Sequence, residues 1–453
     1  MRALALLLAI LLLPLAAAQS PAPAEVAVEG AKLDGKPLEL DDAATLAALQ
    51  AFSQDVSGQR IHDCVQAITT DVPDSYRVMG TPTQALFLEK YRNVFGAMGL
   101  KTGVQHFTKG GPGAPVGGTP NAGTGGNNIV GVLPGLDLHK WVVMGGHYDT
   151  REETMGGGAL DNASGMCTVT ELARAMKAQS DKSPLAATVV FNWYDGEEWG
   201  LYGSVAFAQD LNFTKDLLGL PRTDRVQVLL SQSYDMPGLN YPAKNNAPQY
   251  GAPTDLDEYA VLNLRTAPIH TDGKWACWSY GCYESLKARD DFPALLRNNT
   301  NHQFLVREVA YDVLQYPKEY IWVYDDAYGR SDHIPLIAAG SPGMRIQGSH
   351  DEEYPHYHHA TDTLPALYLM AGSKEALVAA YDTESRIGGT VADYVALTGS
   401  HGRYGDARFL GEAPSATNGT LTGQDAQPTP APGLAFPLVA LVAIALLRRR
   451  GNP

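Results

Sequence analysis

Apolar segments that end in acidic or imidazole side chains set the strongest constraint on how this chain folds. The clearest is KWVVMGGHYDTR, residues 140–151, in which an apolar run leads through two glycines into His147 and Asp149. Four further stretches place such side chains at or after the end of an apolar segment: Asp161-Asn162, Asp195-Gly196-Glu197-Glu198, Asp235-Met236 and the histidine-rich residues 356–359. Ligand-binding side chains of open α/β sheets collect at the carboxyl ends of the strands, so we expect these residues to lie together.

Segments of strand character alternate with segments of helical period along most of the chain. Strands are predicted over 127–135, 140–147, 186–198 and 225–238, and helices over 83–100, 163–179 and 373–399. Such alternation is typical of sheets that carry helices on both faces. The sequence therefore predicts an α/β protein, a three-layer α/β/α fold with a mixed, centrally parallel sheet.

So many carboxylates and imidazoles in one place require compensating positive charge. Buried acids lose hydration and repel one another, which costs free energy unless cations or donors satisfy them. Imidazole and carboxylate without thiolate suit zinc, and two zinc ions that share one carboxylate would satisfy this number of acids. Successive side chains at a strand end point in different directions. In the pair Glu197-Glu198, one residue can therefore bind metal while the other acts as a base on water.

Six short motifs, in this order, resemble those of the di-zinc exopeptidases: GGHYDTR, GALDNASG, YDGEEWGLYGS, SYDMPG, SDHIPLIAAGSPGMR and YHHATDT. That family contains the secreted leucine aminopeptidases, plasma glutamate carboxypeptidase and glutaminyl cyclase. The similarity covers roughly residues 60–398. It implies the zinc-exopeptidase version of the predicted fold and a cofactor of two Zn²⁺ per chain.

The resemblance also implies a role for each matching residue. One zinc would be held by His147 and Asp235, the other by Glu198 and His358, and Asp161 would bridge the two ions. The two catalytic residues would be Glu197, as general base and proton shuttle, and Asp149, as the acid that fixes the tautomer of the zinc-binding histidine.

Some of these assignments leave alternatives open. His358 matches the family frame, but His356 and His359 compete with it, and Asp362 could orient either His358 or a neighbouring loop. By itself, Asp161 before Asn-Ala-Ser would be an ordinary helix N-cap. Three further cleft residues are Tyr357, a candidate donor to the oxyanion, and Asp332 and His333, which equally suit a buried structural pair.

The composition limits the classes of partner that we expect, and the family resemblance limits the reactions that we expect. The formal charge of -15 argues against nucleic acid and anionic membranes as partners. The expected function is an aminopeptidase acting on the N-termini of peptides or proteins. The alternatives are a carboxypeptidase or dipeptidase of the same fold, a glutaminyl cyclase, and a non-catalytic surface binding protein on this scaffold. The oligomeric state is left unassigned.

Four cysteines fit an exported protein. Cys277 and Cys282 are close enough in sequence for a small disulfide loop, whereas Cys167 lies in an apolar helical segment and is expected to be a buried free thiol. The sequence assigns no partner to Cys64.

The two ends of the chain predict export and surface retention. Residues 1–18 have the basic, apolar and small-residue regions of a signal peptide. An N-terminal segment or propeptide over 19–55 precedes a catalytic domain over 56–400. A Pro/Thr/Gly-rich linker over 401–433 leads to an apolar anchor or sorting tail over 434–453 with a basic end. We expect an extracellular or cell-surface protein that touches the membrane only through this tail.

Overall fold

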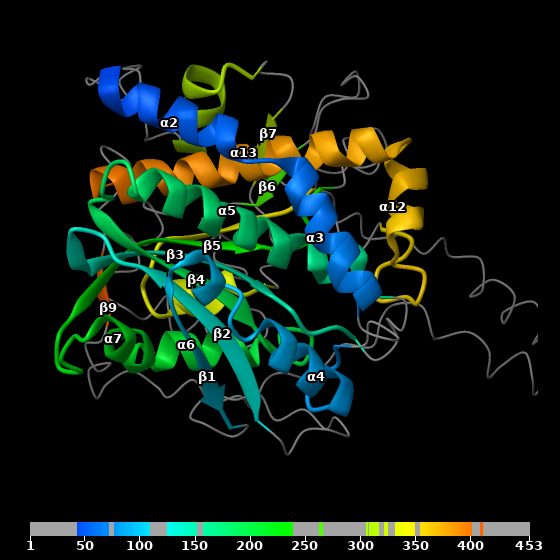
Figure 1. Ribbon diagram of the computed structural model, residues 1–453, viewed down its shortest axis with the longest axis horizontal. Helices are drawn as coiled ribbons and strands as arrows, with labels where there is room; N and C mark the ends of the chain where they lie inside the picture. Colours follow the sequence, from blue (N-terminus) through cyan, green and yellow to red (C-terminus); the bar gives the residue numbers. More distant parts are fainter. Residues whose placement is uncertain are drawn as a thin grey trace, which may run out of the picture.

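A computed structural model describes residues 43–71, 77–108, 125–151, 157–238, 262–265, 305–306, 308–316, 321–324, 331–348, 354–400 and 408–410. Helices lie above and below a twisted central sheet (Figure 1). The predicted signal peptide and C-terminal tail lie outside the described residues, as do Cys277, Cys282 and all of the predicted linker except residues 408–410. Within the described residues, no helix combines the length and apolar character needed to cross a membrane.

The sheet contains nine strands in the described part of the chain, in the order β1-β2-β4-β3-β5-β8-β6-β7, with β9 paired to β5. Their bounds are β1 Lys101–Phe107, β2 Gly126–Leu133, β3 Asp137–His147, β4 Ala187–Tyr194, β5 Val226–Tyr234, β6 Leu262–Arg265, β7 Ile321–Tyr324, β8 Gly343–Ile346 and β9 Arg408–Leu410. The central strands β4, β3, β5 and β8 run parallel, whereas β1, β2, β6 and β9 add antiparallel pairs. The mixed, centrally parallel sheet is therefore confirmed.

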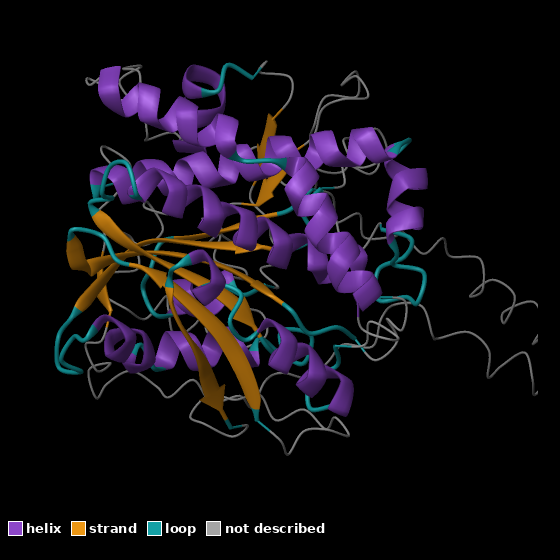
Figure 2. Cartoon of the chain, in the orientation of Figure 1, coloured by secondary structure: helices purple, strands orange, loops and turns teal. Residues whose placement is uncertain are grey.

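Helices cover both faces of this sheet (Figure 2). One layer contains α2 Ala43–Asp55, α3 Gly58–Asp71, α5 Gly165–Ser180 and α13 Lys374–Thr398, and the opposite layer contains α6 Tyr202–Gln209 and α7 Asn212–Leu218 (Figure 1). The remaining helices are α4 Pro82–Tyr91, α11 His333–Ala338 and α12 Leu364–Ala371, with short helical turns η1 Gly96–Met98, η2 Ala159–Ser164 and η3 Val309–Val313. The three-layer α/β/α prediction is confirmed.

One helix is shorter than the helical period of the sequence predicts. The segment 83–100 was expected to be helical throughout, but α4 ends at Tyr91, and the chain continues through turns and the 3₁₀ turn η1. Phe95 is fully buried, and its ring occupies the space beside Gly131 of β2 where a larger residue would overlap it. Packing of this ring against the sheet, rather than the helical period, therefore sets the path of the chain after α4.

The N-terminal helices belong to the main core. Leu49 and Phe52 of α2 are buried in the same apolar cluster as α5 and α13. A disulfide joins Cys64 of α3 to Cys167 of α5, so the prediction of a free thiol at Cys167 is wrong. The packing of α3 on α5 brings the two Cα atoms to 5.6 Å, within the range that a disulfide requires.

Candidate metal centre

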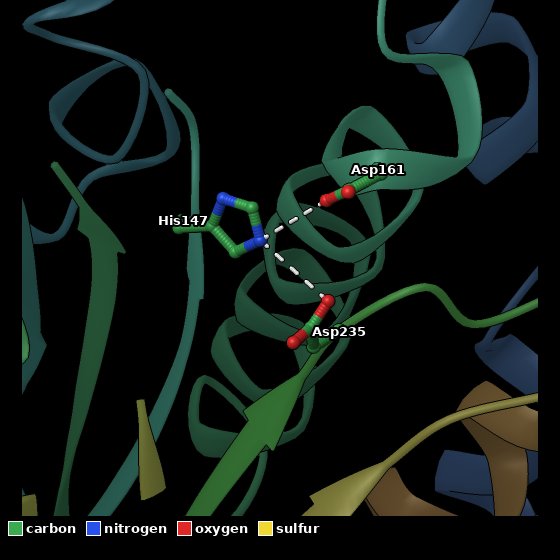
Figure 3. A group of neighbouring side chains, drawn as sticks. All are labelled: His147, Asp161 and Asp235. Carbon is green, nitrogen blue, oxygen red and sulfur yellow. Dashed lines mark ion pairs between the residues drawn. The ribbon is translucent and has the colours of Figure 1, made fainter. Parts of the chain in front are cut away.

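The ends of β3 and β5 place the first group of candidate ligands together. His147 is the last residue of β3 and Asp235 follows β5, while Asp161 lies in η2 (Figure 3). His147 Nε2 lies 3.4 Å from Asp161 Oδ1 and 3.5 Å from Asp235 Oδ1. All three side chains are nearly inaccessible to solvent. One imidazole nitrogen therefore faces two carboxylate oxygens in a buried space.

The two glycines before His147 allow this approach. A Cβ at Gly145 would overlap the ring of Tyr194 on β4. A Cβ at Gly146 would lie 2.9 Å from the carbonyl oxygen of Tyr234 on β5, closer than real Cβ atoms pack. The pair of glycines in the motif therefore brings β3 close to its neighbours just before the histidine.

A second group shares Asp161 with the first. His358 Nε2 lies 3.4 Å from Asp161 Oδ2 and 3.1 Å from Glu198 Oε2. The two oxygens of Asp161 thus face different histidines. In each group, one atom from every residue lies within 4.8 Å of the others. This arrangement of two triads joined by one carboxylate is the geometry expected for a pair of divalent cations.

The histidine-rich segment presents one of its three imidazoles to this centre. His356 Nδ1 lies 2.7 Å from Thr361 Oγ1, and His359 is exposed. Only His358 of the three reaches Asp161 and Glu198. Tyr357 stacks on the His358 ring with centroids 3.7 Å apart and lines the same pocket as Glu197 and Arg345.

Asp362 positions the loop that carries Asp161. The backbone N–H groups of Leu160 and Asp161 donate to the Asp362 carboxylate at 3.0 and 2.9 Å. The hydroxyl of Tyr354 donates to it at 2.8 Å. Of the two roles left open by the sequence, the structure thus supports orientation of a loop. Burial raises the pKa of Asp362 to about 6, against these hydrogen bonds.

Asn162 fastens the same loop to β5. Its amide nitrogen donates to the Tyr234 carbonyl at 2.9 Å, and its amide oxygen accepts from the N–H groups of Gly165 and Met236. The peptide bond between Asp161 and Asn162 is cis. The side chain of Asp161 faces the two histidines, so the N-cap alternative does not describe it.

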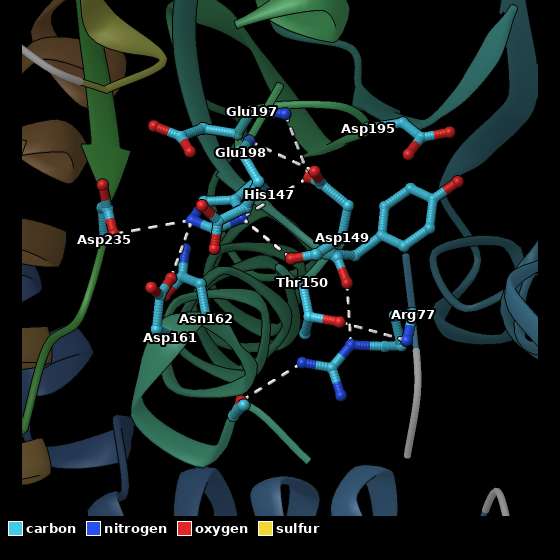
Figure 4. A network of polar contacts seen from close by, with 12 residues as sticks. Arg77, His147, Asp149, Thr150, Asp161, Asn162, Asp195, Glu197, Glu198 and Asp235 are labelled. Carbon is cyan, nitrogen blue, oxygen red and sulfur yellow. Dashed lines mark hydrogen bonds and ion pairs between the residues drawn. The ribbon is translucent and has the colours of Figure 1, made fainter. Parts of the chain in front are cut away.

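Asp149 organises the Glu197-Glu198 turn. The backbone N–H groups of Glu197 and Glu198 donate to its two carboxylate oxygens at 3.0 and 3.2 Å (Figure 4). Its Oδ1 lies 3.6 Å from His147 Nδ1, and its own carbonyl oxygen is closer, at 3.2 Å. Asp149 therefore contacts both the histidine and the turn that carries the predicted base.

The acids make the centre strongly negative. Burial raises the pKa of Glu197 well above its ordinary range; His147 opposes this, and the charges of Asp235 and Glu198 add to it. Burial also opposes the ionisation of Asp161, but the imidazoles of His147 and His358 outweigh it and lower its pKa. Likewise, Glu198 and Asp161 raise the pKa of His358 to about 10 despite its burial. Such a potential favours a bound cation.

Arg77 is a residue that the sequence analysis missed. Its fully buried guanidinium donates to the carbonyl oxygens of Tyr148 and Gly157, each at 2.7 Å, and to that of Gly158 at 3.2 Å (Figure 4). These contacts connect the loop after His147 to the loop before Asp161. A lone arginine outside any recognised motif offers no sequence signal for this role.

Asp332 and His333 lie beside the candidate metal centre, but they are not among the residues that line its pocket. Both are buried at the start of α11, where the adjacent Ser331 hydroxyl lies 2.8 Å from that of Ser233 on β5. Burial raises the pKa of Asp332 to about 7, with His147 and Ser204 opposing the rise. The pocket is lined by His147, Asp161, Glu197, Glu198, Asp235, Met236, Arg345 and Tyr357.

The fold and the candidate metal site agree with the known protein family that part of the sequence matches. Residues 128–230 match the model of Peptidase family M28. This finding confirms the resemblance to the di-zinc exopeptidases. The matched segment includes His147, Asp161 and both glutamates of the turn, whereas Asp235 and His358 lie beyond it.

Curated relatives of similar sequence are named as peptidases, and a solved structure has a similar fold. A probable leucine aminopeptidase of Trichophyton verrucosum is 39% identical over 191 residues, 37% of this chain and 45% of the relative. A probable zinc metalloprotease of Pyrenophora tritici-repentis is 29% identical over 239 residues, 51% of this chain and 48% of the relative. The chain thus spans about half of these curated relatives, and less of others. LapA of Legionella pneumophila shares the fold, with a TM-score of 0.51 and 18% identity over 78% of this chain and 76% of LapA.

Proposed function

We propose that this chain is an exported two-zinc aminopeptidase that hydrolyses the N-terminal residue from peptides or proteins. One observation carries the proposal: the two oxygens of Asp161 face two different histidines, each with a further acid beside it. A single divalent cation needs only one such triad, whereas the second triad with a shared carboxylate suits a pair.

The residues present fit two zinc ions. One ion would be held by His147, Asp161 and Asp235, and the other by Asp161, Glu198 and His358. Oε1 of Glu198 is buried and has no hydrogen-bond partner among the described residues, as expected of an acid whose partner is a metal ion. Zinc bound there supplies Lewis acidity toward the scissile carbonyl and lowers the pKa of water.

Glu197 is the proposed proton carrier. Its carboxylate accepts a proton from the attacking water and then donates that proton to the amine that leaves. A positioned carboxylate beside the attacking water commonly carries out this kind of proton transfer. The Asp149 carboxylate holds Glu197 in position by accepting a hydrogen bond from the backbone N–H of Glu197. The Tyr357 hydroxyl is the proposed donor to the developing oxyanion.

The choice of an aminopeptidase rests on the named relatives, two of which are probable leucine aminopeptidases. Other relatives are glutamate carboxypeptidase 2 homologues of Caenorhabditis, similar over 18% of this chain. The proposed location, outside the cell or at its surface, rests on the signal-peptide pattern of residues 1–18 and the apolar tail over 434–453.

Substrate assays separate these activities. The purified protein is given aminoacyl-nitroanilides, N-blocked peptides and peptides with N-terminal glutamine, and the products are identified by mass. We expect cleavage of free N-termini alone. Cleavage of N-blocked peptides from their carboxyl end would favour a carboxypeptidase, and ring closure of glutamine without hydrolysis would favour a cyclase.

The base is tested by Glu197→Gln. This variant keeps the shape of the pocket and should retain both metal ions, while kcat falls by about 10²–10⁴-fold because proton transfer is lost. Glu89→Gln, at an exposed position of α4, is the matched control and should leave kcat unchanged. Full turnover in Glu197→Gln would exclude this glutamate as the base.

A further inference from the structure

Arg345 lies beside Asp235 on the neighbouring strand. In the parallel pairing of β5 and β8, Ser233 is opposite Arg345 and Tyr234 is opposite Ile346. The N–H of Asp235 then donates to the Ile346 carbonyl at 3.0 Å. Arg345 is only 2% exposed, although its side chain lines the pocket that contains both triads. The sequence motifs gave no role to this arginine.

The two oxygens of Asp235 have different partners. Oδ2 lies 3.0 Å from Arg345 Nη2, whereas Oδ1 lies 3.5 Å from His147 Nε2 (Figure 3 shows the side of Asp235 that faces His147). A guanidinium that holds one oxygen of a carboxylate favours the other oxygen as the ligand of a metal ion. The arginine thus selects one oxygen and one orientation.

We propose that Arg345 is a positioning residue that presents Asp235 to a divalent cation through Oδ1 alone. The inference rests on the proposed two-metal function, and it concerns one half of the centre. The other half has no such support in the described residues, because Oε1 of Glu198 has no hydrogen-bond partner there. In the half-site of His147 and Asp235 a side chain therefore holds the ligating carboxylate itself, whereas in the other half Asp149 holds only the backbone of Glu198.

Two effects of Arg345 on metal binding oppose each other. Its positive charge repels a cation, and its hydrogen bond keeps the buried carboxylate of Asp235 in a ligating position. Without the arginine, Oδ2 becomes a buried charged atom without its partner, and the carboxylate moves to relieve that cost. Loss of an outer residue that orients a ligand typically weakens metal binding by about 10–100-fold. We expect orientation to outweigh repulsion.

The experiment titrates metal-free full-length protein with Co²⁺ and follows the visible absorption bands of each bound ion. The variants are Arg345→Met, which keeps length without charge, and Arg345→Lys, which keeps charge without the planar fork. Arg222→Met is the matched control, since it removes an exposed arginine paired with Asp216. Circular dichroism checks that each variant is folded.

For Arg345→Met, we expect one Co²⁺ to bind with wild-type affinity and the other about 10–100-fold more weakly, with a changed spectrum for that ion alone. Arg345→Lys should restore part of the loss, and this variant also serves if Arg345→Met does not fold. When Asp235 has already been replaced by asparagine, adding Arg345→Met should weaken Co²⁺ binding by less than about a further twofold. A residue that acts only through the Asp235 carboxylate has no effect once that carboxylate is gone.

Three results would overturn the proposal: two ions bound with unchanged affinity in Arg345→Met, tighter binding of either ion, or an equal weakening of both ions in a folded variant. A wild-type protein that binds fewer than two Co²⁺ would instead refute the two-metal function itself. The two failures are therefore distinguishable.

Discussion

Arg77 offers a quantitative test of how the loops of the centre are held. Its guanidinium donates to three carbonyl oxygens, those of Tyr148, Gly157 and Gly158. The Gly158 carbonyl also accepts the N–H of Ala163, so Arg77→Met leaves the other two without this donor. Each buried carbonyl without a donor costs about 1–3 kcal/mol. The variant should therefore lose about 2–6 kcal/mol of unfolding free energy, a large part of the ~5–15 kcal/mol typical of a domain.

Urea unfolding measured by circular dichroism gives that free energy. Arg92→Met, which removes an exposed arginine paired with Glu89, is the control and should change stability by less than about 1 kcal/mol. Arg77→Lys should fall between the two, since one ammonium group cannot reach all three carbonyls in the same geometry. A loss of less than about 1 kcal/mol in folded Arg77→Met would refute the view that this arginine connects the two loops.

Three further predictions concern the pH dependence of stability, the disulfide and the role of Asp149. Burial raises the pKa of Asp393 from 3.8 to about 8. Between these two pH values Asp393 is ionised in the unfolded chain but protonated in the folded protein, so the unfolding free energy falls by about 1.4 kcal/mol for each pH unit of increase. Urea titrations of Asp393→Asn should lack this pH dependence, and an unchanged dependence would contradict the assignment. Replacing Cys64 and Cys167 by alanine should lower the unfolding free energy by about 2–5 kcal/mol, and an equal stability would show that the disulfide contributes nothing. Asp149→Asn should reduce kcat more than it reduces bound zinc, measured by elemental analysis; parallel losses would make it a metal-site residue alone.

Local patterns predicted the class of fold and the ends of its strands. The apolar segments before His147 and Asp235 are buried parallel strands, because strands covered on both faces contain few polar residues. Their ends meet, as expected, at one edge of the sheet. The choice of His358 among neighbouring histidines also agrees with the frame of the family motif, and its contacts with Asp161 and Glu198 explain why.

Residues whose partners lie far away in the chain could not be predicted in this way. Cys64 and Cys167 are 103 residues apart, and only the packing of α3 on α5 brings them together. Asp362 hydrogen-bonds to backbone N–H groups about 200 positions earlier, and a backbone group has no sequence signature. Arg345 lies on β8, which is next to β5 in the sheet but far from it in the sequence. Such contacts depend on the order of strands in the sheet, which local periodicity does not contain.

The metal content of active protein tests the central claim most directly. Protein dialysed against metal-free buffer is analysed for transition metals, treated with a strong chelator, and assayed on an aminoacyl-nitroanilide before and after zinc is returned. We predict two zinc ions per chain, loss of hydrolysis when they are removed, and recovery when they are restored. Full hydrolysis by protein that contains no transition metal and resists the chelator would contradict the account.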